Sequence, residues 1–337
     1  MKAMVLRSPR NLSLAQVEDP APIAAGALIR VTHTGVCGTD LKIFNGAIPV
    51  QYPRIMGHEM VGEVEESSDL NVCKPGDRLI VDPMVSCGTC FHCRIGQSNL
   101  CRNGFVLGRD ADGGFAEWIV APLANIFLLP REIRSQDAPL IQVATTCLHA
   151  QRLAPCFPGE SVVVMGLGVT GQLHVQLAKT RGAAPLIGVS RSPFKGELAQ
   201  RFGADAILSP GADLVREVLK QTSGRGADLV IETTGRTEAL AQAIEMSRHG
   251  GRLLLFGINT ATEGKLPFYQ LYFKELTVFN ARAAKKEDYE PCIDLGRRGT
   301  LQFEPLVTHR LPLSELKRSI ELVDSNENGR LKVILEH

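Results

Sequence analysis

Apolar residues follow two different patterns along this chain of 337 residues, and the change lies near residue 145. The first part holds short apolar stretches that Gly and Pro separate from one another. This pattern is typical of a mainly antiparallel β domain. We expect its strands at residues 2–7, 27–36, 60–67, 77–83 and 116–122.

Continuous apolar runs appear from about residue 146, and helical stretches separate them. Runs that are apolar throughout indicate parallel strands buried on both faces, with helices as the covering layers. The runs lie at 161–166, 184–190, 205–209, 228–235, 251–258 and 276–281. The sequence therefore combines a mainly-β part with an α/β part that forms a doubly wound parallel sheet.

The two patterns also divide the chain into expected domains. We expect a first domain over 1–145, a second domain over 146–282, and a return segment over 283–337 that packs on the first domain. The second domain is then inserted into the first.

A glycine-rich turn follows the first predicted parallel strand. Gly166, Gly168 and Gly171 have the spacing G-x-G-x-x-G, and a helical pattern over 169–182 begins inside the motif. Such glycines let the backbone approach a pyrophosphate, whose charge lies at the helix N-terminus. A tight turn without a ligand is the alternative, but the position between strand and helix in a βαβ unit favours a dinucleotide site.

The end of the second parallel strand indicates which dinucleotide binds. A NAD site usually has Asp or Glu there, which binds the ribose 2′-hydroxyl. Here Ser190 and Arg191 follow the strand, and Lys195 comes shortly after. Cations and hydroxyls suit a 2′-phosphate, so the sequence predicts NADP(H), with a solvated basic turn as the alternative.

Charge and hydropathy exclude several classes of partner. The 37 Lys and Arg nearly balance the 36 Asp and Glu, and no basic run occurs, so we expect neither nucleic acid nor an anionic membrane as a partner. We find no apolar run long enough to span a membrane and no signal peptide. The nine cysteines are an odd number, which favours reduced thiols and metal over a disulfide framework. We therefore expect a cytoplasmic protein.

Four of these cysteines lie close together in the sequence. Cys87, Cys90, Cys93 and Cys101 have the spacing C-x2-C-x2-C-x7-C within the loop 87–101. Four thiolates fill the tetrahedral coordination sphere of zinc and leave no position for a substrate, so such a site is structural. An iron–sulfur cluster also uses four cysteines and is the alternative. The chemistry of the protein must then lie elsewhere.

Several motifs together resemble a known family. "GVCGTDLKIFNG", with Cys37, and "IMGHEMVGEV", with His58, precede the four cysteines and "GLGVTG". In this order they closely resemble the zinc-dependent medium-chain dehydrogenases, above all the polyol and sugar dehydrogenase branch, and the likeness covers essentially the whole chain. The resemblance implies a GroES-like catalytic domain with an inserted Rossmann domain, and a substrate between them. We expect two zinc ions per chain and a homodimer or homotetramer.

The family pattern also implies roles for single residues. Cys37 and His58 would ligate a catalytic zinc, and Thr39 would hydrogen-bond the reacting oxygen and pass its proton. Glu59 would lie next to the zinc or exchange as a ligand. Lys332 matches a basic position near the cofactor pyrophosphate in relatives. Arg282 matches a position near the substrate in the polyol branch.

Two positions depart from the pattern of the family. The third zinc ligand of relatives is Cys or Glu, whereas this chain has Gln142, whose amide oxygen carries no charge. Glu59 could restore the missing charge by direct ligation. Relatives often relay the proton through a His at the position of Lys42, so the relay route differs here.

The residues and the resemblance together predict a zinc-dependent oxidoreductase. Zinc polarises the oxygen of a secondary alcohol or ketone, and NADP(H) exchanges the hydride. The expected substrate is a polyol, sugar or sugar acid. A catalytically silent sensor that binds zinc and nucleotide is the alternative, since Gln142 and Lys42 depart from the family. A zinc-ribbon protein that binds nucleic acid is disfavoured by the neutral charge.

Overall fold

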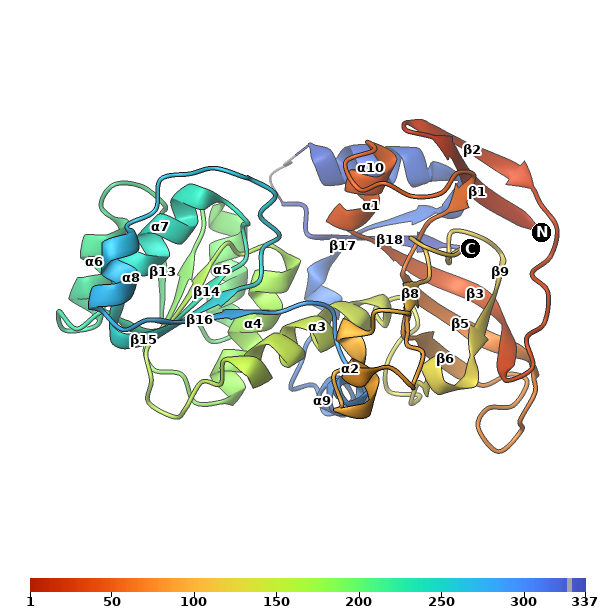
Figure 1. The fold of residues 1–337 in the computed structure, drawn as a ribbon, viewed down its shortest axis with the longest axis horizontal. Helices are drawn as coiled ribbons and strands as arrows, with labels where there is room; N and C mark the ends of the chain where they lie inside the picture. Colours follow the sequence, from red (N-terminus) through yellow and green to blue (C-terminus); the bar gives the residue numbers. More distant parts are fainter. Residues whose placement is uncertain (326–328) are drawn as a thin grey trace. The chain divides into compact units, whose positions relative to one another are not determined.

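The computed structural model describes residues 1–325 and 329–337, and these residues form two compact units. We call residues 1–145 with 285–337 the β unit and residues 146–284 the α/β unit (Figure 1). No helix among residues 1–325 and 329–337 is long and apolar enough to cross a membrane.

The β unit is built mainly from antiparallel strands. Its strands are β1 (Lys2–Ser8), β2 (Asn11–Gln16), β3 (Gly26–Val36), β4 (Arg54–Ile55), β5 (Glu59–Ser67), β6 (Arg78–Val81), β7 (Met84–Val85), β8 (Phe105–Val106), β9 (Trp118–Pro122), β10 (Ile126–Leu128), β17 (Val307–Pro312) and β18 (Lys332–Glu336). Its helices are α1 (Gly38–Phe44), α2 (Phe91–Arg94), α9 (Tyr289–Arg297), α10 (Leu316–Asp324) and the first part of α3 (Pro139–Leu153).

The main sheet of the β unit has the strand order β10-β6-β5-β3-β18-β17, and β9 also pairs with β3. Strand β18, from the end of the chain, pairs antiparallel with β3, so that Val333 lies opposite Val36. Strand β5 pairs with the other edge of β3, and Glu59 lies opposite Gly35. The return segment therefore belongs to the same sheet as the strands that lead to Cys37 and away from His58.

The α/β unit contains one six-stranded parallel sheet with the order β13-β12-β11-β14-β15-β16. The strands are β11 (Val162–Met165), β12 (Leu186–Val189), β13 (Ala206–Leu208), β14 (Ala227–Glu232), β15 (Ser247–Leu255) and β16 (Thr277–Asn280). The helices are α4 (Val169–Thr180), α5 (Pro193–Arg201), α6 (Leu214–Gln221), α7 (Thr237–Met246) and α8 (Phe268–Phe273). This order confirms the predicted doubly wound parallel sheet.

Both faces of the parallel sheet are buried, as the continuous apolar runs predict. Val163 and Val230 face a core that α6 and α7 complete with Leu214, Val218 and Ile244. The alternate residues along the same strands are also fully buried. Burial of each aliphatic side chain contributes about 1.5–3 kcal/mol, so helices must cover both faces (Figure 1).

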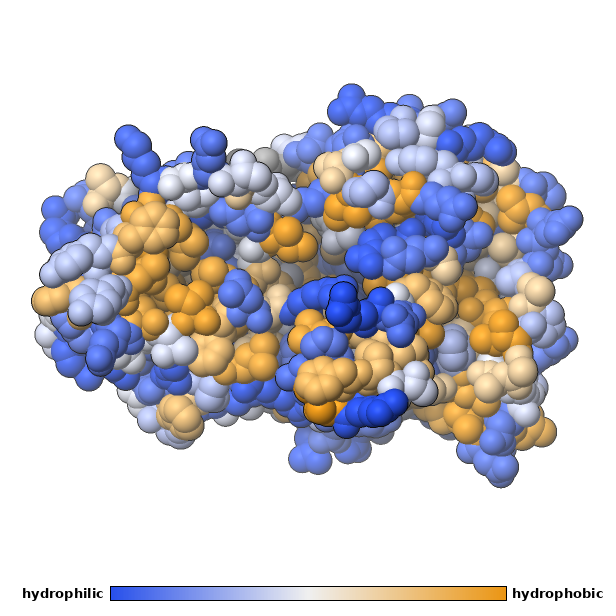
Figure 2. Space-filling model, viewed as in Figure 1, coloured by the Kyte–Doolittle hydropathy of each residue, from blue (hydrophilic) through white to orange (hydrophobic). Residues whose placement is uncertain are grey.

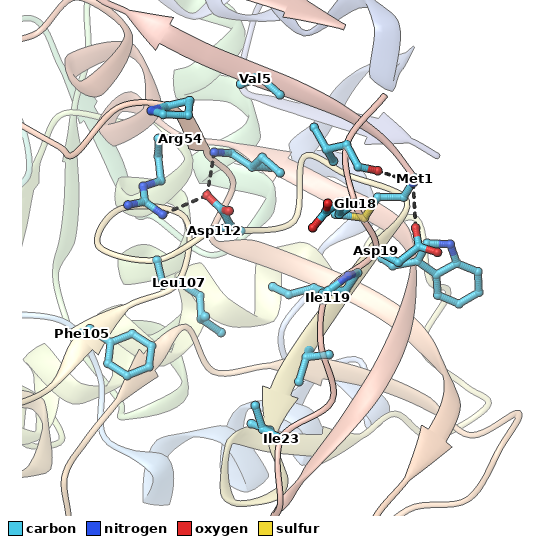
Figure 3. Close-up of a pocket in the computed structure, with 18 of the residues that line it drawn as sticks. Met1, Val5, Glu18, Asp19, Ile23, Arg54, Phe105, Leu107, Asp112 and Ile119 are labelled. Atoms are coloured by element: carbon cyan, nitrogen blue, oxygen red, sulfur yellow. Dashed lines mark hydrogen bonds and ion pairs between the residues drawn. The ribbon is translucent and has the colours of Figure 1, made fainter. Parts of the chain in front are cut away.

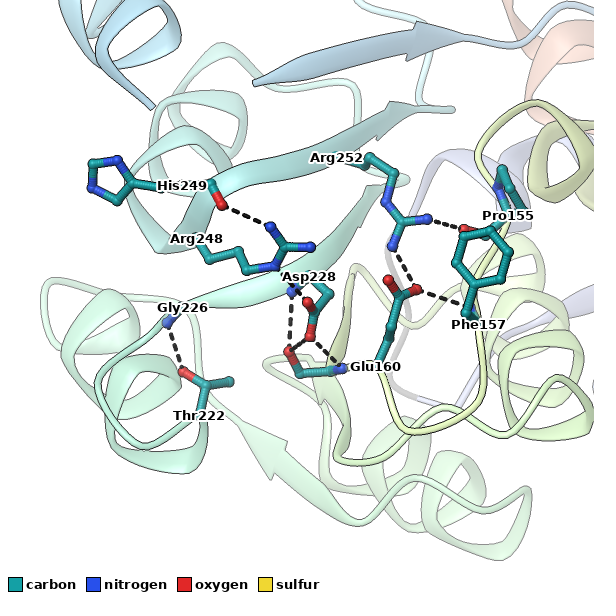
Figure 4. A network of polar contacts seen from close by, with 10 residues as sticks. Pro155, Phe157, Glu160, Thr222, Gly226, Asp228, Arg248, His249 and Arg252 are labelled. Carbon is teal, nitrogen blue, oxygen red and sulfur yellow. Dashed lines mark hydrogen bonds and ion pairs between the residues drawn. The ribbon is translucent and has the colours of Figure 1, made fainter. Parts of the chain in front are cut away.

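Charged residues join the amino ends of the central strands (Figure 4). The backbone N–H and the hydroxyl of Ser161 donate to Asp228 Oδ2 at 2.9 and 2.6 Å, and Arg248 pairs with the same carboxylate. Arg252 pairs with Glu160 and covers the ring of Phe157 at 5.4 Å from its centroid. These contacts lie at the ends of β11, β14 and β15 opposite to the glycine-rich turn, so the carboxyl ends stay available for a ligand.

Candidate functional site

Cys37 lies at the point where β3 ends and α1 begins. It is the N-cap of α1, and its backbone N–H donates to Asp40 Oδ2 at 2.8 Å. Asp40 has no exposed surface, and it occupies the N3 position, where a carboxylate also stabilises the helix start. The local helix geometry therefore fixes the backbone that carries the Cys37 thiol.

His58 precedes β5 and contacts the same carboxylate. Its Nδ1 lies 3.3 Å from Asp40 Oδ1, so Nε2 is the nitrogen that can face a metal. Burial lowers the pKa of His58, but the charge and hydrogen bond of Asp40, together with the Cys37 thiol, raise this pKa well above its usual value. The surroundings of the ring therefore favour a positive charge, which a metal cation can supply instead of a proton.

Glu59 is 1% exposed and lies beside Lys332, whose side chain is 4% exposed. Glu59 Oε2 forms an ion pair with the Lys332 ammonium group, while Oε1 has no hydrogen-bond partner among residues 1–325 and 329–337. A Cβ atom at Gly35 would lie 1.9 Å from Oε2, so only glycine leaves room for this carboxylate. The sequence alone did not predict that Lys332 contacts Glu59.

These residues form a donor set that fits zinc. One ligand atom each from Cys37, His58 and Glu59 can lie within 4.8 Å of the others. Sulfur, imidazole nitrogen and carboxylate oxygen are the ligands that zinc takes in proteins. A buried carboxylate oxygen without a partner is costly, and a cation beside Oε1 would satisfy it.

Three further candidates lie on helices α1 and α3. Thr39 and Lys42 are half-buried residues of α1. Gln142 is half-buried in the first turn of α3, and its backbone carbonyl accepts a hydrogen bond from the Thr145 hydroxyl at 2.6 Å. Their contacts with a metal or a substrate stay predictions.

The four clustered cysteines form the second group of metal donors in the described part of the chain. The sulfur separations are 3.6 Å for Cys90 and Cys93, 3.8 Å for Cys90 and Cys101, and 3.5 Å for Cys87 and Cys101. Thiolates ~2.3 Å from a tetrahedral zinc lie about 3.8 Å apart. Backbone N–H groups of Thr89 and Cys90 lower the pKa of Cys87 to about 6. The loop therefore fits one zinc ion, and sulfurs this close leave no room for several irons.

The glycine-rich turn between β11 and α4 has the geometry of a phosphate-binding loop. Gly166 has a φ of +90°, and a Cβ atom at Gly171 would lie 1.9 Å from the Gly166 carbonyl oxygen. Gly168 is the N-cap of α4 without a side-chain cap, and a Cβ atom there would meet nothing within 4 Å. Thr233, which the sequence reading missed, donates to the carbonyl of Gly166 at 2.9 Å. Free N–H groups of a helix start and open space beside them suit a pyrophosphate.

The residues that follow β12 form a polar turn. Ser192 caps α5 through Lys195 N–H, and the Ser190 hydroxyl accepts from Ser192 N–H at 3.1 Å. Arg191 is exposed and forms no ion pair with any residue that the structure describes. Arg282 is exposed after β16, in the same α/β unit. No carboxylate stands at the end of β12, in agreement with the sequence.

A cavity of about 610 Å³ lies in the β unit (Figure 3). Its walls are mostly apolar, with Leu107 and Ile119 among them, and the ion pair of Arg54 with Asp112 lies at its border. Neither Cys37 nor any other candidate ligand lines it. This cavity is therefore not the site of the predicted reaction.

Comparison with known proteins places these features in one family. The family model of the alcohol dehydrogenase GroES-like domain matches residues 24–131, and that of the zinc-binding dehydrogenases matches residues 169–298. An L-threonine 3-dehydrogenase of Pyrococcus abyssi is 32% identical over 332 residues, which cover 96% of this chain and 95% of that protein. The chain belongs to the zinc-dependent medium-chain dehydrogenase superfamily.

One further relative supports the polyol-dehydrogenase-like character of this dehydrogenase, and one solved structure supports its fold. An L-galactonate-5-dehydrogenase of Escherichia coli is 32% identical over 343 residues, or 99% of this chain and 98% of that protein. The crystal structure of a zinc-binding dehydrogenase from Sinorhizobium meliloti, bound to NADP, has a TM-score of 0.93. It is 32% identical and covers 100% of this chain and 99% of that chain. The resemblance expected from the sequence is confirmed, and the chain is an oxidoreductase of the zinc alcohol dehydrogenase family.

Proposed function

We propose that the protein transfers a hydride between NADP(H) and a secondary alcohol or ketone of a polyol, sugar or sugar acid. The observation that carries this proposal is the convergence of half-buried Cys37 and His58 with buried Glu59, whose Oε1 has no hydrogen-bond partner in the described part of the chain. Cys37, His58 and Glu59 would hold a zinc ion there, and its chemistry would be to polarise the substrate oxygen. We propose Gln142 as a further ligand.

The residues around this centre position the ligands and move the proton. Asp40 orients the His58 ring and the Cys37 backbone. In the oxidative direction, NADP⁺ bound at the glycine-rich turn would accept the hydrogen of the carbinol carbon together with the electron pair of the broken C–H bond. The hydroxyl O–H bond also breaks, and we assign its proton to the Thr39 hydroxyl. Lys42, one turn further along α1, is the proposed next group on the way to solvent.

Glu59 is proposed to ligate the metal in at least one state and to withdraw when substrate arrives. Support comes from the ion pair of Oε2 with Lys332, while Oε1 has no hydrogen-bond partner among the described residues. A carboxylate held at one oxygen can turn its other oxygen toward or away from a cation. This exchange would keep one coordination position open, as a catalytic zinc requires.

NADP(H) is proposed to bind at Gly166, Gly168 and Gly171, with its 2′-phosphate at Ser190, Arg191 and Lys195. The exposed guanidinium of Arg191 and the missing carboxylate after β12 support this assignment. The S. meliloti structure was solved with NADP. We also propose that Lys332 contacts the pyrophosphate of the cofactor, in addition to its ion pair with Glu59.

The substrate class follows from Arg282 and from the relatives. A guanidinium suits several hydroxyls or a carboxylate better than an alkyl chain. One relative is named for L-galactonate, a sugar acid, and another for L-threonine, which also carries a secondary alcohol. We therefore propose a polar secondary alcohol as substrate.

The quartet Cys87, Cys90, Cys93 and Cys101 is proposed to hold a second, structural zinc. Sulfur separations of 3.5–3.8 Å support one tetrahedral ion. All nine cysteines lie among the described residues and form no disulfide there, which supports action in the reducing cytoplasm.

Self-association is proposed for the α/β unit. Helix α8 has no buried residue, and Phe268, Tyr269, Tyr272 and Phe273 are more than half exposed. Strand β16 is an edge strand of the sheet beside them. Figure 2 shows hydrophobic side chains gathered around α8. An aromatic surface next to a sheet edge favours a homodimer or homotetramer.

One experiment tests the proposed function. Purified protein is analysed for zinc and then assayed with a panel of polyols, sugars, sugar acids, L-threonine and ethanol, with NADP⁺ and NAD⁺ in parallel. We expect two zinc ions per chain and turnover of a polar secondary alcohol with NADP⁺. Binding of NADP⁺ without turnover of any member, with a single zinc, would instead support a sensor.

A further inference from the structure

A buried hydrogen-bond network in the β unit starts at Tyr289, the first residue of α9. Tyr289 has no exposed surface, and its hydroxyl donates to Asp82 Oδ1 at 3.3 Å. Its ring stacks on Phe127 of β10, with centroids 4.4 Å apart and planes at 8°. The stacking fixes the ring, so the hydroxyl can only point to its polar neighbours.

Asp82 is itself held in place after β6. Its backbone N–H donates to the Asn125 carbonyl at 2.8 Å. The Asn125 side chain donates back to the carbonyls of Asp82 and Met84, each at 2.9 Å. Lys286 donates to Asn125 Oδ1 at 3.2 Å. The carboxylate that accepts from Tyr289 therefore stands on a rigid and almost fully buried support.

The network continues into α3 through Thr145, which has no exposed surface. Its hydroxyl donates to the Gln142 carbonyl at 2.6 Å, so its oxygen can only accept from the neighbouring Tyr289 hydroxyl, whose proton it shares with Asp82. A threonine hydroxyl that bonds a carbonyl three residues earlier in a helix alters the local backbone geometry. Thr145 thus connects the phenol to the peptide unit of Gln142.

We propose that Tyr289, held by Asp82, is a positioning residue for Gln142, because it sets the first turn of α3 through Thr145. This inference rests on the proposed ligation of zinc by Gln142. Metal–ligand distances tolerate changes of only about 0.2 Å, so a small rotation of this turn weakens the bond. The neutral amide oxygen binds zinc less strongly than Cys or Glu would, so its exact direction matters more.

The test measures how fast zinc leaves the protein. Full-length wild type, Tyr289→Phe, Gln142→Ala and the double variant are loaded with zinc and mixed with a chromophoric chelator. Tyr289→Phe keeps the stacked ring and removes only the hydroxyl. Tyr52→Phe, a half-buried tyrosine of the same unit, is the matched control. Zinc release and the kcat and KM of each variant are recorded.

Gln142→Ala identifies the relevant phase, since it should accelerate the release of one zinc and leave the other unchanged. We expect Tyr289→Phe to accelerate the same phase by about tenfold, as for other residues that support a ligand. In the Gln142→Ala background, Tyr289→Phe should add no further acceleration, because the positioned side chain is gone. The kcat of the single variant Tyr289→Phe should fall, while its KM for the nicotinamide cofactor stays unchanged.

A second pair of variants covers the case in which Tyr289→Phe folds poorly. Thr145→Val removes the connecting hydroxyl and should accelerate the same phase, whereas Thr145→Ser keeps the hydroxyl and should restore slow release. The positioning role alone would be overturned if the effects of Tyr289→Phe and Gln142→Ala on the rate of zinc release multiply in the double variant. It would also be overturned if Tyr289→Phe and Tyr52→Phe release zinc at equal rates. If Gln142→Ala accelerates no phase, Gln142 is not a ligand, and both the ligation and the inference fall.

Discussion

The Lys332 ammonium group neutralises the Glu59 carboxylate inside the β unit, where the two side chains are 4% and 1% exposed. Removal of the lysine leaves a buried carboxylate without its counter-charge. Loss of one partner of a buried ion pair typically costs about 3–5 kcal/mol. We expect Lys332→Met to lower the free energy of unfolding of the zinc-free protein by this amount in urea titrations.

Two variants complete this first test. Lys317→Met, an exposed lysine of α10, should leave stability unchanged. The double variant Lys332→Met/Glu59→Gln should recover much of the lost stability, because no unpaired charge remains. A double variant as unstable as Lys332→Met alone would contradict a role based on charge.

The cofactor preference should depend on Arg191. We expect wild-type kcat/KM to favour NADP⁺ over NAD⁺ by at least about tenfold, since ~1.4 kcal/mol is a modest demand on a charge-assisted contact. Arg191→Ala should remove most of this preference through a higher KM for NADP⁺. Arg216→Ala, an exposed arginine of α6, serves as the control. Equal use of both cofactors by the wild type would exclude the assignment.

The cysteine quartet should bind one zinc ion per chain. We expect Cys93→Ser to lose one zinc per chain by elemental analysis and to unfold at a lower temperature, because metal binding and folding share free energy. Cys73→Ser, at a buried cysteine outside the quartet, should keep its full metal content. Full zinc content and an unchanged melting temperature in Cys93→Ser would refute the structural role.

Asp82 should make stability depend on pH. Burial raises the pKa of Asp82 to about 6 in the folded protein, above its ordinary value of 3.8. The folded state then binds the proton more tightly, so this group stabilises the fold most at low pH. Its contribution falls between about pH 4 and pH 6, by up to ~3 kcal/mol, and is constant above that window.

Asp82→Asn removes the titrating group, so the stability of the variant relative to wild type should rise across this window. Unfolding by urea at several pH values between 4.5 and 7 measures the difference. Because the metal sites are the same in both proteins, their own pH dependence cancels. A difference that stays constant with pH would show that Asp82 does not titrate there.

The fold class could be predicted because it depends on patterns of neighbouring residues. Runs such as 161–166 and 228–235 are apolar throughout, and only a sheet covered on both faces buries them. Short strands such as β4, with Arg54 and Ile55 alone, carry too few residues for a pattern and were not predicted.

The candidate site was only partly predictable, because its supporting contacts join distant segments. Glu59 and Lys332 lie near opposite ends of the sequence, and no local pattern connects them before β18 pairs with β3. Tyr289 and Asp82 hydrogen-bond each other but also lie far apart in the sequence, so no local pattern connects them. Asp40 is different: its position three residues after Cys37 is the spacing of a helix capping box, a local signal that the sequence reading did not use.

The double contact of Asp40 has a consequence for which metal the protein carries. One carboxylate holds both the Cys37 backbone and the His58 ring, so the two donors are brought together when the chain folds and not when the ion arrives. The entropic cost of gathering them is thereby separated from metal uptake. Metal ions can then exchange without refolding of the chain. The amount of each metal in the cell, as well as the affinity of the site for it, therefore determines which metal is bound. Cells grown with excess cobalt should therefore yield folded protein with cobalt at the Cys37–His58 centre.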